Sequence, residues 1–308
     1  MKLILSKPRG FCAGVVRAID TVEKALELWG APIYVKHQIV HNRHVVKRLE
    51  DKGAIFIEDV NEVPEGARLI YSAHGVSPEI RKQAKQRKLQ EIDATCSLVT
   101  RIHSAAKRFA TKGYQILLIG HRNHVEIIGT AGEAPEVTTI IETVEDVEKL
   151  TFSPEQKLFY VTQTTLSIED IQDITKALET KYPSIETLPT SSICYATTNR
   201  QVAIKQIALD VELVLVVGDP TSSNSNRLRE VAEHQGIRSY LINSFKEIDP
   251  MWLKGIQTLG MSAGASTPEE IVQECIEYLV KLGVNQVEEV SVIEENVFFQ
   301  LPKELQLI

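Results

Sequence analysis

The chain has 308 residues, 43% of them hydrophobic and 24% charged, and a formal net charge of −7. These proportions are typical of a soluble globular protein, and the length exceeds the ~250 to 300 residues at which one hydrophobic core stops growing, so we expect two or three domains. The net charge, and the lack of any run of Lys and Arg longer than a pair, argue against nucleic acid or a membrane surface as the main partner.

The beginning of the sequence, "MKLILSKPRG", has an apolar run of only three residues. A signal peptide needs ~7 to 15 apolar residues and a membrane span ~18, and no stretch approaches the latter length. We therefore expect a cytoplasmic protein whose thiols stay reduced. A disulfide framework is therefore not expected of its four cysteines, which are Cys12, Cys96, Cys194 and Cys275. They form no CxxC pair, so neither a zinc ribbon nor a thioredoxin-like redox pair is indicated.

In chain order, the segment after Cys12 first predicts a helix, with an apolar stripe of Val15, Ile19, Val22 and Leu26. A strand and polar loop follow in "PIYVKHQIVHNRH" from residue 32. A second helix then leads to the strand "AIFIEDVNEV". A last strand enters another polar loop in "LIYSAHGVS" from residue 69.

The same order of elements follows Cys96 and Cys194, which lie 84 and 98 residues after the preceding cysteine of the series. The next two helical stripes are Leu98, Ile102, Ala105 and Phe109, and then Ala203, Ile204, Ile207 and Val211. The corresponding first loops are "QILLIGHRNHVEIIG" and "VLVVGDPTSSNSNR", and the second loops are "LFYVTQTTLS" and "TLGMSAGAST". Six elements agreeing in order indicate an internal repeat.

Strands that alternate with helices predict an α/β protein built from parallel sheets. We expect three modules at 14–95, 96–193 and 194–283, with 1–13 and 284–308 associated with the first. Ligands of such sheets gather beyond the carboxyl ends of the strands. If the modules surround a pseudo-threefold axis, their loops and three cysteines face one cavity.

A helix N-terminus favours the thiolate, the form of cysteine that binds metal. Three thiolates suit either zinc with an open fourth position or three corners of a 4Fe-4S cluster, and the spacing does not separate the two. Cys275 lies outside this series, on the apolar side of "PEEIVQECIEYLVKLG", where we expect a buried core thiol.

The polar loops carry the hydroxyls, amides, imidazoles and backbone N–H groups that a phosphate or diphosphate needs. Plainer interpretations exist for each residue: Ser, Thr and Asn before a helix are commonly N-caps, and Glu126 suits an early helical position. Arg17, Arg101 and Arg200 recur five or six residues beyond the cysteines, which a solvated helix face also explains. Neither GxGxxG nor GxxxxGK[ST] occurs, so nicotinamide and nucleoside triphosphate sites lack motif support.

Nine ordered motifs together resemble the 4-hydroxy-3-methylbut-2-enyl diphosphate reductase (LytB/IspH) family, over residues 1 to about 305. They are "PRGFCAGVVRAI", "HNRHVV", "SAHGVS", "DATCSLVT", "GHRNHVEIIGT", "VTQTTLS", "ICYATTNRQ", "SSNSNRL" and "SAGAS". The resemblance implies a trefoil of three α/β modules around a central iron-sulfur cluster. It also implies reductive removal of an allylic hydroxyl, giving isopentenyl and dimethylallyl diphosphates, in the last step of the non-mevalonate pathway.

The resemblance also implies roles for individual residues. Cys12, Cys96 and Cys194 would carry one 4Fe-4S cluster, Glu126 a proton relay, and Thr164 the contact with the substrate hydroxyl region. The diphosphate ligands would be His41, His74, His124, Ser222, Ser223, Asn224 and Ser266. His124 would also share in catalysis. An external one-electron donor of the ferredoxin or flavodoxin type is implied, since no second cluster, flavin or nicotinamide motif is found.

Two positions depart from the family pattern: Ser97 and Val125 stand where proline is common, which affects loop rigidity rather than the ligand set. Three other functions stay open at this stage. They are a non-redox hydro-lyase that uses the cluster as a Lewis acid, a zinc hydrolase acting on a phosphorylated substrate, and a redox-sensing regulator.

Overall fold

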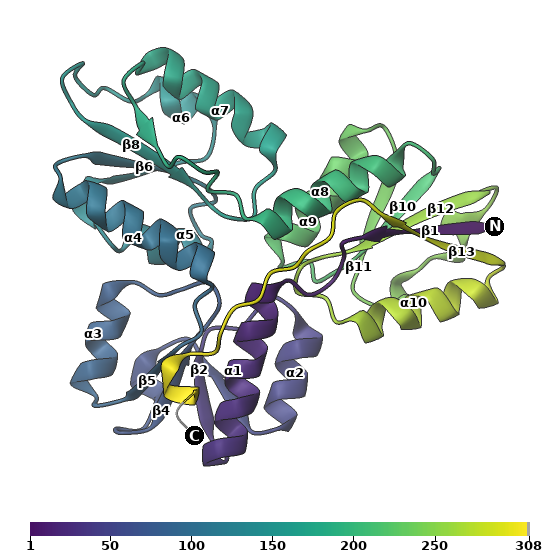
Figure 1. The fold of residues 1–308 in the computed structure, drawn as a ribbon, viewed down its shortest axis with the longest axis horizontal. Coiled ribbons are helices and arrows are strands. Elements are labelled where there is room, and N and C mark those ends of the chain that lie inside the picture. The colour runs from purple at the N-terminus through teal and green to yellow at the C-terminus, as the bar shows by residue number, and fades with distance from the viewer. Residues whose placement is uncertain (307–308) are drawn as a thin grey trace. The chain divides into compact units, whose positions relative to one another are not determined.

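The first segment of the chain forms a parallel four-stranded sheet of order β3-β2-β4-β5 in the computed structural model, which describes residues 1–306 (Figure 1). Its strands are β2 (Ile33–Lys36), β3 (Ala54–Ile57), β4 (Arg68–Tyr71) and β5 (Gln90–Asp93). Its helices are α1 (Ala13–Trp29), α2 (Arg43–Asp51) and α3 (Pro78–Gln86). Helix α1 buries Val15, Ile19 and Val22 and ends at Trp29, before Gly30, whose φ of 73° is a conformation that glycine adopts readily.

The second segment repeats this arrangement in a parallel sheet of order β7-β6-β8-β9. Its strands are β6 (Gln115–Ile119), β7 (Thr138–Ile141), β8 (Leu158–Thr162) and β9 (Glu186–Thr187). Its helices are α4 (Ser97–Thr111), α5 (Val125–Ala131), α6 (Val144–Glu148) and α7 (Ile168–Lys181).

The third sheet has five parallel strands in the order β11-β10-β12-β1-β13. The strands are β1 (Lys2–Lys7), β10 (Leu213–Val217), β11 (Arg238–Ile242), β12 (Thr258–Ala263) and β13 (Gln286–Ser291). The helices are α8 (Tyr195–Ala208), α9 (Ser223–His234) and α10 (Glu269–Lys281). Every residue of β10 is buried, as expected for a strand of a parallel sheet covered on both faces.

Strand order confirms the α/β class, the parallel sheets and the internal repeat, and it corrects one expectation. Residues 1–13 and 284–308 were expected with the first module, but β1 lies between β12 and β13 in the third sheet. Only the tail at 299–306 falls in the unit that contains the first sheet. In the third sheet β1 takes the place that β5 and β9 take in the other sheets. The physical reason is its apolar sequence: Leu3, Ile4 and Leu5 are buried and need a covered strand position.

Equivalent backbone hydrogen bonds support the repeat at the level of single residues. The residue after each central strand donates its N–H to the last residue of the neighbouring strand: His37 to Ile57, Gly120 to Ile141, and Gly218 to Ile242, at 2.8, 2.9 and 2.8 Å. The three polar loops that follow β2, β6 and β10 therefore begin with the same hydrogen bond to the neighbouring strand.

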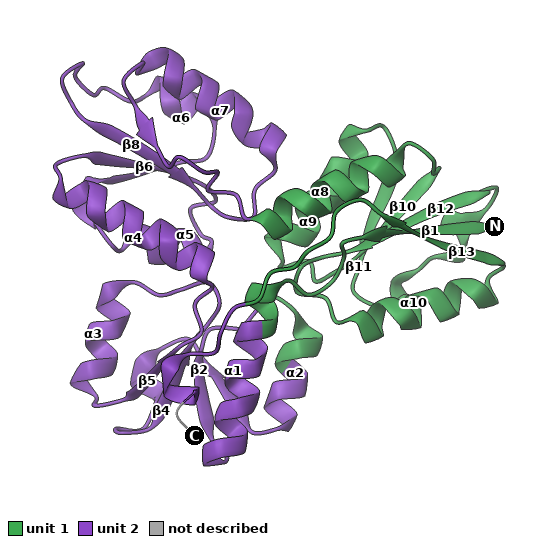
Figure 2. Cartoon of the chain, viewed as in Figure 1, with its two compact units in different colours: residues 1–16, 41–46, 195–298 green, residues 17–40, 47–194, 299–308 purple. Residues whose placement is uncertain are grey.

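Two compact units divide the chain, as coloured in Figure 2. Unit 1 contains 1–16, 41–46 and 195–298, with the five-stranded sheet, and unit 2 contains 17–40, 47–194 and, of the described tail, 299–306. The proposed module boundaries at 14–95, 96–193 and 194–283 stay a prediction.

Across residues 1–306 we find no helix both long and apolar enough to pass through a membrane.

Cys275 belongs to the core of unit 1, as predicted. Its side chain is fully buried in a cluster with Leu3, Leu215 and Met261. Burial raises the pKa of its thiol to about 12, with a smaller contribution from Glu274 and Glu247. The thiol is therefore protonated at neutral pH and serves packing.

We predict that Cys275→Ser lowers the free energy of unfolding by about 1 to 3 kcal/mol, because a hydroxyl at this position is buried among apolar side chains. Urea unfolding followed by circular dichroism measures the change. An unchanged midpoint would show that the position tolerates a polar group and is not part of a tightly packed core.

Candidate functional site

Each cysteine of the spaced series stands immediately before a helix, which confirms that prediction. Cys12 precedes α1, Cys96 is the N-cap of α4, and Cys194 precedes α8. All three are partly exposed, in contrast to Cys275. Their accessibility and their position at helix N-termini suit a ligand role rather than core packing.

The backbone N–H of each of these cysteines is held by a loop that follows the third strand of a sheet. Cys96 donates to the Ala73 carbonyl at 3.0 Å, and Cys194 to the Thr164 carbonyl at 3.0 Å. Cys12 donates to the Ala265 carbonyl at 3.2 Å. The motifs "SAHGVS", "TQTTLS" and "SAGAS" are therefore structurally equivalent, and each fixes one cysteine.

The remaining predicted residues are divided between the two units, which Figure 2 distinguishes. Unit 2 holds Cys96, Cys194, His74, His124, Glu126 and Thr164. Unit 1 holds Cys12, His41, Ser222, Ser223, Asn224 and Ser266. Each set is described within its own unit.

Glu126 and Thr164 form a buried pair in unit 2, with exposed fractions of 3% and 4%. The Thr164 backbone N–H donates to Glu126 Oε1 at 2.7 Å, and the Thr164 hydroxyl donates to Oε2 at 2.8 Å. Burial raises the pKa of Glu126 above its ordinary value, although the Thr164 hydrogen bonds and the charge of His103 act to lower it. At a given pH the protonated form of this carboxyl group is therefore more populated than that of an exposed glutamate, as a proton donor requires.

His74 and His124 lie together in the same unit, with ring centroids 6.1 Å apart and planes at 82°. His124 is the N-cap of α5, and its Nδ1 accepts from the Glu126 backbone N–H at 3.2 Å. The ring of His74 is within hydrogen-bond distance of the Ser72 hydroxyl, at 3.2 Å. Both imidazoles are therefore placed by local contacts beside the helix that carries Glu126.

His103 is a buried residue of this region that the sequence did not single out, because it lies within the amphipathic pattern of α4. Its Nδ1 is 2.9 Å from Glu133 Oε1. Its ring packs so closely on Gly75 and Gly129 that a Cβ at either glycine would come within 3.1 or 3.2 Å of it. The glycines thus let the His74 loop and α5 approach the helix that begins at Cys96.

In unit 1 the predicted polar residues also meet. The Ser266 hydroxyl donates to the His41 carbonyl at 2.9 Å. Ser222 caps α9 by accepting from the Ser225 N–H at 3.3 Å, so the capping interpretation of this serine is correct. Asn224 is buried, and its Nδ2 has no hydrogen-bond partner within residues 1–306. An unsatisfied buried donor at a helix N-terminus indicates a place where an anionic or polar ligand would be stabilised.

Arg43 and Asp219 form a contact that the sequence gave no means to find, since 176 residues separate them. The Arg43 backbone N–H and Nε donate to Asp219 Oδ2 at 3.1 and 3.0 Å. Burial acts to raise the pKa of Asp219, but hydrogen bonds from Thr221 and Arg43 outweigh it and lower the pKa to about 2. This pair connects the His41 segment to the loop that carries Ser222.

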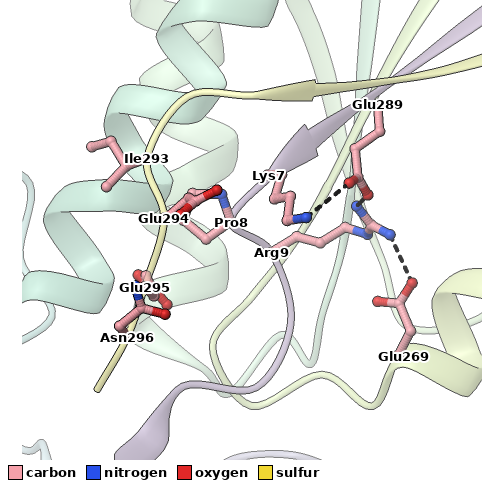
Figure 3. Close-up of a pocket in the computed structure, with 9 residues that line it drawn as sticks. All are labelled: Lys7, Pro8, Arg9, Glu269, Glu289, Ile293, Glu294, Glu295 and Asn296. Carbon is pink, nitrogen blue, oxygen red and sulfur yellow. Dashed lines mark hydrogen bonds and ion pairs between the residues drawn. The ribbon is translucent and has the colours of Figure 1, made fainter.

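A cavity of about 460 Å³ lies elsewhere in unit 1, beside the segment between β1 and Cys12. Figure 3 shows Arg9 there, paired with Glu289 of β13 at 2.6 Å and with Glu269 of α10 at 2.8 Å. Four glutamates line the cavity and none of the predicted substrate residues does, so its charge does not suit a diphosphate.

Among residues 1–306, no cluster of three or more His, Cys, Asp or Glu side chains is arranged to hold a metal ion.

We predict that Asp219→Asn lowers the free energy of unfolding at pH 7 by about 2 kcal/mol. The folded-state pKa of about 2 lies below the ordinary 3.8, so the carboxylate stabilises the fold above pH 4 and loses that effect as the pH falls toward 2. The two proteins should therefore converge in stability at low pH. Urea unfolding between pH 7 and pH 2.5 tests this, with Asp210→Asn at an exposed position as control; a pH-independent difference would contradict it.

Comparison with known proteins shows the family of this chain. The family model described as LytB protein matches residues 3–280. A protein of Protochlamydia amoebophila named 4-hydroxy-3-methylbut-2-enyl diphosphate reductase is 71% identical over 98% of this chain and 97% of its own length. One of the same name from Chlamydia pneumoniae is 60% identical over 99% of both.

Two solved structures are also similar. The E-1-hydroxy-2-methyl-but-2-enyl-4-diphosphate reductase of Plasmodium falciparum superposes with a TM-score of 0.97 at 49% identity, covering 99% of this chain and 96% of that one. An (E)-4-hydroxy-3-methyl-but-2-enyl diphosphate reductase described as the terminal enzyme of the non-mevalonate pathway gives 0.66 at 30% identity, covering 91% and 99%. The chain belongs to the LytB family.

Proposed function

We propose that this protein is a 4-hydroxy-3-methylbut-2-enyl diphosphate reductase, acting in the last step of the non-mevalonate isoprenoid pathway. The observation that carries the proposal is the 71% identity over nearly the full length to a protein of that name. The buried Glu126–Thr164 pair provides a proton donor of the kind the reaction needs. The substrate is an allylic diphosphate with a terminal hydroxyl group.

The reaction replaces that hydroxyl by hydrogen. The carbon–oxygen bond breaks, the oxygen leaves as water after taking up one proton, and two electrons with a second proton complete the product. Protonation at one end or the other of the allylic system gives isopentenyl or dimethylallyl diphosphate. Hydroxide is a poor leaving group, so a positioned acid at the oxygen lowers the barrier.

Cys12, Cys96 and Cys194 are proposed as the three protein ligands of one 4Fe-4S cluster. Three partly exposed cysteines, each at a helix N-terminus and each held through its backbone N–H, form a donor set suited to such a cofactor. When bound, the cluster would supply electrons one at a time and an iron with a vacant position as Lewis acid.

The diphosphate is proposed to bind through neutral dipoles and imidazoles. The proposed ligands are His41, His74, His124, Ser222, Ser223, Asn224 and Ser266. The unsatisfied Nδ2 of Asn224 at the start of α9 supports this assignment. Such local donors explain how a protein with net charge −7 binds an anion.

Glu126 and Thr164 are proposed as the proton relay to the leaving hydroxyl, with His124 beside them. In the ionised state Thr164 donates its hydroxyl to Glu126. Once Glu126 is protonated, the carboxyl can donate to the Thr164 oxygen, and the threonine hydroxyl is free to donate to the substrate. The raised pKa of Glu126 favours the protonated state from which the relay starts.

Electrons are proposed to come from an external donor of the ferredoxin or flavodoxin type, because the sequence has no flavin or nicotinamide motif and no second cluster motif. The cytoplasm is proposed as the compartment, since it keeps the three cysteine thiols reduced.

We predict that Cys12→Ser, Cys96→Ser and Cys194→Ser each lose the iron and the reductase activity after anaerobic reconstitution, because a hydroxyl is a far weaker ligand for iron than a thiolate. Cys275→Ser is the matched control and should retain both. Iron and sulfide counts, the visible spectrum and turnover with a chemical reductant are measured together. Full activity in any of the first three variants would refute the ligand set, and zinc without sulfide in the wild type would refute the cofactor.

We predict that Glu126→Gln keeps the iron and the diphosphate affinity but lowers turnover by about 10²- to 10⁴-fold, the range for removing a general acid. Thr164→Val should show a loss in the same direction, whereas Thr164→Ser should recover part of the rate. Equal rates for wild type and Glu126→Gln would remove the proton role from this residue.

The raised pKa of Glu126 also predicts a pH-dependent stability difference. The unfolded chain ionises this group near its ordinary value of 4.5, whereas the folded protein holds the proton to higher pH. Between those two values the folded state binds more protons, so wild type loses stability as the pH rises. Urea unfolding from pH 4 to pH 8 should show Glu126→Gln gaining stability relative to wild type. A constant difference over this range would show that burial does not raise the pKa.

A further inference from the structure

Arg17, Arg101 and Arg200 lie five, five and six residues beyond Cys12, Cys96 and Cys194, on the helices that begin at these cysteines. A solvated helix face would leave such side chains in water. Each instead reaches the irregular segment between the fourth strand of a sheet and the following cysteine. Each of these contacts lies within one unit.

Arg17 holds the segment between β5 and Cys96 in unit 2. Its Nη1 donates to the carbonyl of Thr95, the residue directly before Cys96, at 2.9 Å. Its Nη2 donates to the Asp93 carbonyl at 3.1 Å, and its Nε to the Gln300 carbonyl at 2.7 Å. All three nitrogens of the guanidinium group are therefore engaged with backbone carbonyls.

Arg101 makes the corresponding contact in the second segment of unit 2. Its Nη2 donates to the Ser191 carbonyl at 2.8 Å, and its Nη1 to the Thr190 hydroxyl at 2.9 Å. Both acceptors lie between β9 and Cys194. Arg101 belongs to the helix that Cys96 begins, yet it fixes the approach to Cys194.

Arg200 completes the series in unit 1, where its side chain is fully buried. Its Nη2 and Nε donate to the Gly10 carbonyl at 2.8 and 3.2 Å, two residues before Cys12. Its Nη1 donates to the Ala196 carbonyl and to Glu295 Oε1, both at 3.0 Å. Glu295, which Figure 3 shows on the stretch after β13, balances the buried charge.

These contacts need arginine rather than any cation. A guanidinium group is planar and presents several N–H donors in a fixed fork, so it can hold two carbonyls, or one carbonyl from two directions. A segment without strand or helix pairing has free carbonyls, and the fork removes much of its freedom to move. Lysine, with one flexible ammonium group, does this less well.

We propose that Arg17, Arg101 and Arg200 are positioning residues for the three cysteines, each fixing the segment that carries the next cysteine: Arg17 for Cys96, Arg101 for Cys194 and Arg200 for Cys12. The inference rests on the proposed ligand role of these cysteines for its functional meaning. The positional part concerns backbone order alone and is measurable in the protein without its cofactor.

The test is hydrogen–deuterium exchange of the reduced full-length apoprotein, read by mass spectrometry on the peptides that contain each cysteine. The reporters are the cysteine N–H groups, which are hydrogen-bonded to Ala265, Ala73 and Thr164. In Arg17→Gln, the Cys96 peptide should exchange about fivefold faster, the effect of losing hydrogen bonds that keep a segment closed. Arg101→Gln should act on Cys194, and Arg200→Gln on Cys12.

The pattern separates positioning from general destabilisation. Arg17→Gln should leave the Cys12 peptide unchanged, although Arg17 and Cys12 share the start of α1. Lys107→Gln, at an exposed position of α4, is the control for Arg101→Gln and should leave all three peptides unchanged. If Arg200→Gln does not fold, Arg200→Lys should show an intermediate effect confined to the Cys12 peptide. Equal acceleration of all three peptides, or acceleration only at the cysteine of the same helix, would overturn the proposal.

A second measurement links position to the cofactor. After anaerobic reconstitution, a ferrous chelator should withdraw iron from Arg17→Gln and Arg101→Gln about tenfold faster than from wild type, since a loosened ligand segment opens more often. Arg17→Lys and Arg101→Lys should release iron at rates between those of wild type and the glutamine variants. If iron release from these variants is as slow as from wild type, the arginines do not affect how the cysteines hold the proposed cofactor. A wild type that binds no iron would refute the proposed cofactor, while the exchange pattern would still decide the positional claim.

Discussion

The arrangement of the cysteines depends on one repeated hydrogen bond, from the backbone N–H of a cysteine to the loop that follows the third strand of a sheet. The bond occurs three times, to Ala265, Ala73 and Thr164, with lengths between 3.0 and 3.2 Å. Because the donor is the backbone N–H, this hydrogen bond does not use the cysteine sulfur. The same loops carry His74, Thr164 and Ser266, so the order that fixes a sulfur also fixes the polar groups beside it.

The buried carboxyl groups of Glu126 and Asp219 lie in two different electrostatic environments. Around Glu126 burial disfavours the charged form and raises the pKa of the carboxyl group. Around Asp219 the surroundings supply donors from Thr221 and Arg43, so a charge is favoured and the proton is lost. The difference in pKa follows from burial, which dominates at Glu126, and from hydrogen-bond donors, of which Asp219 has four and Glu126 has two. The first suits proton transfer, and the second suits the stable connection of two loops.

The helices and the parallel sheets could be predicted from the sequence, because each depends on a periodic pattern of apolar residues within a short segment. The cysteine spacing and apolar stripes predicted the helices after Cys12, Cys96 and Cys194, and alternating strands predicted parallel sheets. The place of β1 could not be read in this way, because its pairing with β12 joins residues 256 apart and leaves no local signal. The Arg43–Asp219 contact and the arginine contacts are hidden for the same reason. Capping serines and ligand serines also look alike in sequence, as Ser222 shows.

The position of β1 between β12 and β13 has a consequence for biosynthesis. A strand that leaves the ribosome early must wait for partners made some 250 residues later before its edges are covered. Until then the segment bearing Cys12 has neither its strand ladder nor the Ala265 carbonyl that holds it. The nascent chain can thus order the Cys96 and Cys194 segments first, so loading of the proposed inorganic cofactor during translation would have to await synthesis of β12 and the Ala265 loop.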